Sequence, residues 1–302
     1  MGRKEEIGRQ AAEAFETARG GIRPAKDALR RVPHPTREGL GHVVANTLWE
    51  LTRVTVRHEI DDPSDYFGDA RTHLADSGSL VIISNHFDRL DTTIIGHVVE
   101  QNVTPLDRIT GVASLKYLDP NRSRVISRVI NNVSQVKGFS VIPVIQGLQE
   151  ELDYYSEHTE ATEGRTPRRF NVDAMKEAAE ILNKPGEVLM IDPEGTKSPK
   201  RKLIEAHEGL DSIMKLSRRR ALILPIAIVP PDTRRIVPPY TKVVVRPGAL
   251  FSLEDVQQEQ EAIKLATGKR PELGLTGRMM LRLAQLLPPQ NQGHYRQFVN
   301  QE

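Results

Sequence analysis

The chain has 302 residues, with 42 Lys and Arg against 40 Asp and Glu, so its formal net charge is +2. Hydrophobic residues make up 38% of it, and it contains no cysteine. This apolar content excludes a disordered chain and suffices for one α/β domain with an added helical segment. The absence of cysteine excludes disulfide scaffolds, cysteine nucleophiles and Cys-ligated zinc or iron–sulfur centres.

Residues 1–52 are predicted to form an N-terminal helical segment. Residues 38–52 place apolar side chains at helical spacing beside Trp49. Few Lys or Arg flank that apolar face, which favours a helix packed on the protein's own core over one lying on lipid. Charges near the N-terminus argue against a signal peptide, and no uncharged run reaches the roughly 18–20 residues of a membrane-spanning helix. We therefore expect a soluble protein, attached at most to a membrane surface.

Residues 53–302 are predicted to form an α/β domain with a mixed central sheet flanked by helices, because short apolar runs alternate with helical patterns. The expected strands are 53–60, 80–84, 108–113, 139–145, 188–191, 222–229 and 241–246. The expected helices are 66–75, 90–100, 122–131, 171–183, 205–218, 253–266 and 276–287. In such sheets the chemistry gathers beyond the carboxyl ends of the strands.

Two further stretches have unusual charge. Residues 146–169 are polar, acidic first and basic last, and are expected to form an inserted surface segment rather than a core element. Residues 195–242 contain eleven Lys and Arg against four Asp and Glu, a local charge of +7. Such a patch attracts phosphates or anionic head groups, unless it is only a solvated face. Aromatic residues make up only 5%, and no nucleic-acid-binding module is recognisable, so we expect no nucleic-acid partner.

The first motif with chemical meaning follows the predicted strand 80–84. His86 falls in the turn after that strand, and Asp91 opens the next helix, so the carboxylate of Asp91 can reach back to the imidazole. A carboxylate that orients a histidine makes the imidazole a general base. A capped helix beside a hydrogen-bonded histidine explains the same spacing. Asp88 adds a metal-binding alternative, but no further His or Asp cluster completes a ligand set, so no metal is expected.

The second motif follows the predicted strand 188–191. Its turn presents Glu194, Gly195, Thr196 and Lys197 in series. Gly195 permits close backbone approach to a ligand, Glu194 can accept hydrogen bonds from hydroxyl groups, and Thr196 and Lys197 can contact a phosphate. A third apolar run, 221–231, contains Pro225, which indicates an edge strand, a bulge or a strained segment.

These three motifs occur in the order and approximate spacing of a known family. Asn85-His86-x-x-x-x-Asp91, Pro193-Glu194-Gly195-Thr196 and Leu224-Pro225-Ile226-Ala227 resemble the glycerolipid acyltransferases, which include 1-acylglycerol-3-phosphate and glycerol-3-phosphate O-acyltransferases. The resemblance covers about residues 75–250. It implies that His86 takes the acceptor's proton with Asp91 as its partner, and that Glu194 and Gly195 help to hold the glycerol phosphate. It also implies a donor that is an acyl-CoA or acyl carrier protein thioester, with no metal or other cofactor.

The chain departs from the family pattern at three positions. Asp88 places a second negative charge near the histidine. Lys197 stands where the family has Arg, so a forked phosphate donor becomes a point charge. Val144 stands where the family has a phosphate-binding Arg. Arg168 or Arg169, at the end of the polar insertion, is expected to supply that charge instead.

The sequence therefore predicts an O-acyltransferase that acts on a glycerophosphate acceptor, with lysophosphatidate favoured and glycerol-3-phosphate possible. We expect it in the cytoplasm, peripheral at the inner face of the membrane. One alternative is a non-catalytic anion- or lipid-binding protein on the same fold, which Asp88 and Val144 favour. Another is a metal-dependent phosphoester hydrolase that uses His86, Asp88 and Asp91.

Overall fold

A computed structural model describes residues 57–87, 91–119, 121–122, 138–147, 149–198, 200–217, 221–229, 242–269 and 271–299. The predicted N-terminal helical segment 1–52 lies outside the described residues, as do Asp88 and most of the predicted helix 122–131. The division into that segment and an α/β domain stays a prediction.

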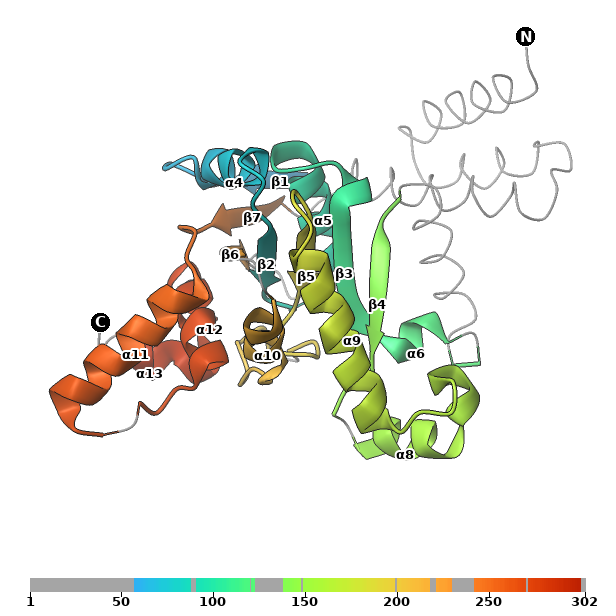
Figure 1. Ribbon diagram of the computed structural model, residues 1–302. Helices are drawn as coiled ribbons and strands as arrows, with labels where there is room; N and C mark the ends of the chain where they lie inside the picture. Colours follow the sequence, from blue (N-terminus) through green and yellow to red (C-terminus); the bar gives the residue numbers. More distant parts are fainter. Residues whose placement is uncertain are drawn as a thin grey trace, which may run out of the picture.

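The described part is built on a mixed seven-stranded sheet with helices on both faces (Figure 1). Its order is β1-β7-β6-β2-β5-β3-β4. The five strands from β6 to β4 are parallel, whereas β7 pairs antiparallel with β6, and β1 pairs parallel with β7. The strands are β1 (Arg57–Ile60), β2 (Leu80–Ser84), β3 (Ile109–Ser114), β4 (Ser140–Val144), β5 (Val188–Ile191), β6 (Leu222–Val229) and β7 (Lys242–Pro247).

The helices form two layers, one on each face of the sheet. Alternate residues of a strand point to opposite faces, so a strand can pack against both layers. Leu80 and Ile82 of β2 pack in one core with α4 and α5, and Val81 and Ile83 pack in a second core with α9, α10 and α12. The α-helices are α4 (Tyr66–Ala75), α5 (Asp91–Asn102), α6 (Leu115–Leu118), α8 (Gln149–Glu157), α9 (Pro167–Leu182), α10 (Gly209–Leu216), α11 (Leu253–Thr267), α12 (Leu275–Gln285) and α13 (Arg296–Val299). Short 3-10 turns lie at η1 (Leu106–Arg108), η2 (Thr159–Thr162) and η3 (Gly293–Tyr295).

The seven predicted strands are all present, and the α/β prediction with a mixed sheet is confirmed. The prediction for 146–169 is wrong in one respect, since this stretch forms α8, η2 and the start of α9. Tyr155 of α8 is fully buried and Glu151 is 3% exposed. The helix thus contributes to a small core with Leu115 and Phe170. The polar composition of this stretch did not indicate that buried face.

Pro225 lies in an interior strand, so the edge-strand alternative is wrong. On one side Pro225 stands opposite Ile83 of β2. On the other side the ladder with β7 begins only at Ile226, and an isolated bridge joins Ile223 to Phe251. Pro225 falls in the interruption between them, where a strand needs no N–H donor.

Candidate active site

The two predicted motifs lie next to each other at the carboxyl ends of two interior strands, here called the carboxyl edge of the sheet. β2 and β5 are neighbouring parallel strands with Ile83 opposite Ile191, so the segments that follow them leave the sheet at the same edge. Asn85–Phe87, here the histidine segment, follows β2. Asp192–Ser198, here the Glu-Gly-Thr turn, follows β5. This edge is where open α/β sheets bind their ligands.

Asn85 fixes the histidine segment to the neighbouring strand β6. Its side chain is fully buried and bonds the backbone of Ile228 in both directions. Asn85 Nδ2 donates to the Ile228 carbonyl at 3.1 Å, and the Ile228 N–H donates to Asn85 Oδ1 at 2.8 Å. The amide group thus continues the sheet for one more pair of hydrogen bonds, and His86 follows it immediately.

Asp91 is buried at the first position of α5, where the helix N-terminus favours a negative charge. Its Oδ2 accepts a hydrogen bond from the Phe87 N–H at 2.6 Å. His86 is half-buried, and its Nδ1 has no hydrogen-bond partner in the described part of the chain. The structure therefore places Asp91 beside the histidine segment through the backbone. The expected hydrogen bond to the ring is not seen at Nδ1, and the orienting role of Asp91 stays a prediction.

Glu194 joins the two segments directly. Its side chain is fully buried. Glu194 Oε2 accepts from the His86 N–H at 3.2 Å, and Oε1 accepts from the Ile204 N–H at 2.8 Å. The Ser198 N–H donates to the His86 carbonyl at 2.9 Å. The backbone of His86 is thus held at both its N–H and its carbonyl. Glu194 was expected to receive acceptor hydroxyls, but its observed partners are backbone amides.

Gly195 supplies a backbone conformation that other residues adopt at a cost. Its φ is +65°, in the left-handed region, and its N–H closes the turn on the Asp192 carbonyl at 2.9 Å. A Cβ at this position would lie 2.7 Å from Cδ2 of His207. The sequence assigned Gly195 to close approach by a ligand. The neighbour that approaches it in the structure is a histidine ring.

Burial shifts the pKa values of two carboxylates near His86. Burial raises the pKa of Glu194 to about 8, although the N–H groups of Ile204 and His86 oppose this and nearby Asp192 and Asp91 add to it. Burial likewise raises the pKa of Asp192, whereas the charge of His86 and hydrogen bonds from two hydroxyl groups lower it. Buried acids whose pKa values lie far from their ordinary values are typical of functional sites.

Asp192 is a residue whose role sequence reasoning missed. It directly follows β5, and its carboxylate accepts hydrogen bonds from Ser84 Oγ and, at 3.5 Å, from Thr92 Oγ1. The available signal was an acidic residue at the end of a buried apolar strand. The partners could not be named without the order of the strands.

The predicted phosphate-binding residues are only partly brought together. Thr196 is half-buried and Lys197 is exposed, and neither side chain makes a hydrogen bond or ion pair with a described residue. Arg168 and Arg169 are exposed in the first turn of α9, and Arg169 Nε pairs with Asp173 Oδ2 at 3.3 Å. Neither arginine contacts His86 or the Glu-Gly-Thr turn among the described contacts. The expected convergence of these cations on one site is not seen.

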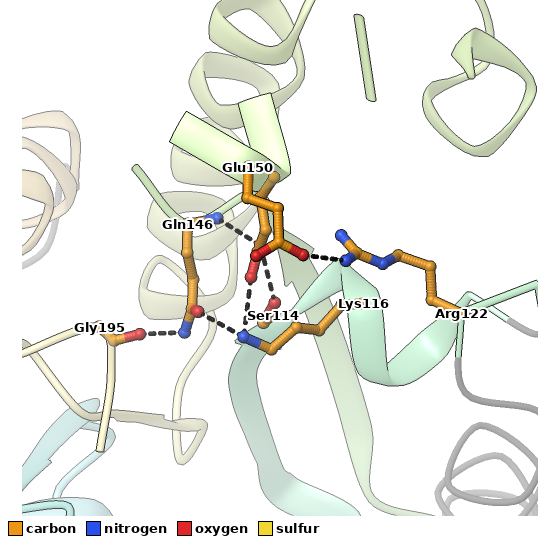
Figure 2. A network of polar contacts seen from close by, with 7 residues as sticks. Ser114, Lys116, Arg122, Gln146, Glu150 and Gly195 are labelled. Atoms are coloured by element: carbon orange, nitrogen blue, oxygen red, sulfur yellow. Dashed lines mark hydrogen bonds and ion pairs between the residues drawn. The ribbon is translucent and has the colours of Figure 1, made fainter. Parts of the chain in front are cut away.

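A polar network continues the site toward β3 and β4 (Figure 2). Gln146, two residues after β4, donates from Nε2 to the Gly195 carbonyl. Lys116 Nζ donates to Gln146 Oε1 at 2.9 Å and to Glu151 Oε1 at 2.7 Å. Ser114 Oγ, at the end of β3, donates to Glu151 Oε2 at 3.2 Å. The network buries the Glu151 carboxylate against a cation and holds the Glu-Gly-Thr turn from a second side.

Two further features of the described residues concern metal binding and membrane insertion. Among the described residues, no three His, Cys, Asp or Glu side chains gather in a way that could hold a metal ion. Asp88, the third member of the metal alternative, lies outside that part. Within the same described ranges, no helix has both the length and the apolar content to span a membrane.

One comparison with known protein families agrees with the motifs. A family model described as Acyltransferase matches residues 69–229, more than half of the chain and all of the strands from β2 to β6. Among solved structures, the chain is similar to the crystal structure of the 1-acyl-sn-glycerophosphate acyltransferase from Thermotoga maritima. The two share 14% identity and a TM-score of 0.39 over 83% of this chain and 87% of that one. No curated protein is similar in sequence to this chain.

Proposed function

The chain belongs to the acyltransferase family, and we propose that it moves a fatty acyl group from an acyl thioester to a hydroxyl of a glycerophosphate acceptor. Lysophosphatidate is the favoured acceptor and glycerol-3-phosphate the second. The observation that supports the proposal is the position of His86, whose imidazole is half-buried at the carboxyl edge of the sheet. Its backbone is fixed by Glu194 and Ser198 from the adjacent turn.

In the proposed reaction His86 acts as general base. It takes the proton of the acceptor hydroxyl while that oxygen forms a bond to the thioester carbonyl carbon. The carbon–sulfur bond then breaks, and the sulfur leaves as a thiol with the proton returned by the imidazolium. The products are an ester and a free thiol, and no metal is needed. Asp91 is proposed to orient the ring and to favour its protonated form.

The rigid attachment of His86 supports this role. A base that is held in place before the substrate arrives needs no ordering during the reaction, which lowers the activation barrier. Asn85 anchors the chain immediately before the histidine, and Glu194 binds its N–H. Glu194 and Gly195 are therefore proposed to shape the site through the backbone.

The acceptor phosphate is proposed to bind beside Thr196 and Lys197, whose side chains have no other described partner. Arg168 and Arg169 are proposed as further cations for this phosphate, because Asn171 of the same helix bonds the backbone of Ile145 just after β4. The donor is proposed to be acyl-CoA or an acyl carrier protein thioester. Because the acceptor would be a lipid, we place the reaction at the inner face of the cytoplasmic membrane, with the protein peripheral to it.

Acyl transfer from a labelled donor tests the proposal. Wild type, His86→Ala and His158→Ala are each given labelled acyl-CoA with lysophosphatidate or glycerol-3-phosphate. His158 is a matched control because it is an exposed histidine at the end of α8. Loss of a positioned general base should reduce the rate by on the order of 10²–10⁴-fold in His86→Ala and leave His158→Ala unchanged.

Equal product from wild type and His86→Ala would remove His86 as the base. Vesicle binding without turnover by any donor would instead favour the non-catalytic lipid-binding alternative. The same assay with a chelator present addresses the hydrolase alternative, because acyl transfer by His86 requires no metal.

A further inference from the structure

One carboxylate touches both flanks of the histidine segment. Asp192 accepts a hydrogen bond from Ser84 Oγ at the end of β2 and another, at 3.5 Å, from Thr92 Oγ1 in the first turn of α5. Ser84 precedes His86 by two residues, and Thr92 follows it by six. The single side chain that directly follows β5 therefore connects the strand before His86 with the helix after it.

We infer that Asp192 is a positioning residue for His86: it holds together the two ends of the segment that carries the ring by accepting hydrogen bonds from Ser84 and Thr92. The inference deepens the proposed function and rests on it for the reaction that His86 serves. It assigns a role at the histidine segment to a second carboxylate besides Asp91, from a different part of the fold.

The surroundings of Asp192 support this assignment. The backbone of the histidine segment is already held by the two other acids, since Asp91 accepts from the Phe87 N–H and Glu194 from the His86 N–H. Within the described ranges, no Lys or Arg forms an ion pair with Asp192. Its described hydrogen-bond partners are the two hydroxyl groups that flank the segment.

Asp192→Asn tests the inference, because the amide keeps the size of the side chain but only one of the two oxygens that accept from Ser84 and Thr92. The quantities measured are kcat and KM for acyl transfer. Asp65→Asn is the matched control, since Asp65 is an exposed helix cap on α4.

We expect kcat to fall about 10- to 100-fold in Asp192→Asn, with KM for the donor within about twofold of wild type. Asp65→Asn should match wild type in both. A kcat at the wild-type value would overturn the inference. A loss of activity matched by an equal loss of folded protein in circular dichroism would also overturn it, because that result is what a merely structural role predicts.

A second variant covers the case in which Asp192→Asn does not fold. Ser84→Ala/Thr92→Val removes both hydroxyl donors and keeps the carboxylate. We expect kcat about 10-fold below wild type or lower, and unchanged kcat would overturn the clamp. Failure of the proposed function is distinguishable, because wild type itself would then transfer no acyl group, whereas failure of the inference leaves wild type active and the variants equal to it.

Discussion

At the scale of single residues, Glu194 has the most constrained environment at the site. It is fully buried, both of its oxygens accept backbone N–H groups, and two further carboxylates lie nearby. Burial raises its pKa to about 8 from an ordinary value of 4.5. Between these two values the folded protein binds a proton that the unfolded chain has released. The contribution of Glu194 to stability is therefore greatest below about pH 4.5 and declines as the pH rises to about 8.

Glu194→Gln removes this titration. The amide can accept only one of the two N–H groups well, so we expect the variant to lose about 1–3 kcal/mol at about pH 5. The deficit should shrink as the pH rises to about 8, because wild type alone must ionise a buried acid. Urea unfolding at three pH values measures this. Glu160→Gln, an exposed control on η2, should parallel wild type, and parallel curves for Glu194→Gln would refute the raised pKa.

Residue types at the site could be predicted, but their partners could not. His86, Asp91 and Glu194 were identified because strands that end in polar residues mark the functional edge of an α/β sheet. The roles of Asp192 and Gln146 depend on β5 lying between β2 and β3. Strand order is a property of the packed sheet, and nothing in the local sequence encodes it. The role of Arg168 and Arg169 stays a prediction, because no described contact joins either arginine to the Glu-Gly-Thr turn.

At the scale of elements, the segment after the Glu-Gly-Thr turn is held by the C-terminal end of the described chain. The Leu203 N–H donates to the Asn291 carbonyl at 3.0 Å, and the His294 N–H donates to the Leu203 carbonyl at 2.9 Å. The Ala206 N–H donates to the hydroxyl of Tyr295 at 3.1 Å. Ile204, in the middle of this segment, bonds Glu194. The C-terminal residues therefore support the residue that holds His86.

Tyr295→Phe tests this support. Tyr295 is fully buried, and its burial, together with the charges of Glu194 and Glu205, raises its pKa to about 12. Removal of the hydroxyl leaves the Ala206 N–H unpaired, and we expect a loss of about 1–3 kcal/mol. Hydrogen exchange of residues 203–206 should accelerate.

Tyr154→Phe is the control for this change, because its ring stacks on His158 and its hydroxyl makes no described hydrogen bond. It should leave the exchange of residues 203–206 unaltered. Equal protection of that segment in Tyr295→Phe and wild type would show that the backbone bonds alone hold it.

The boundaries of the elements show where local patterns suffice. The apolar run 80–84 is β2 without any shift, because every residue of it is buried. The start of α9 was predicted four residues late, although Thr166 caps it and Pro167 opens it. Those two residues were counted as part of a polar insertion. α8 was missed because its buried face contains Glu151 and Tyr155, and a buried carboxylate paired with Lys116 has no apolar signature.

At the scale of the whole molecule, one sheet separates two hydrophobic cores and β2 contributes to both. Ile82 belongs to the core with α4 and α5, and Ile83 belongs to the core with α9, α10 and α12. Both side chains are fully buried. The strand that leads to His86 thus has its position fixed by packing on both faces. A site at the end of such a strand should remain formed until the sheet itself unfolds.

Ile82→Val and Ile83→Val test this arrangement. Each should lower the free energy of unfolding by about 0.5–1.5 kcal/mol. The double variant should lose the sum to within about 0.5 kcal/mol, because the two neighbours in sequence pack in different cores and share few contacts. Urea unfolding by circular dichroism and loss of acyl transfer should show one common midpoint in every variant. Leu265→Ala, at a leucine that is 83% exposed on α11, should shift neither. Separate midpoints for activity and for the sheet would mean that the site edge opens independently of the two cores.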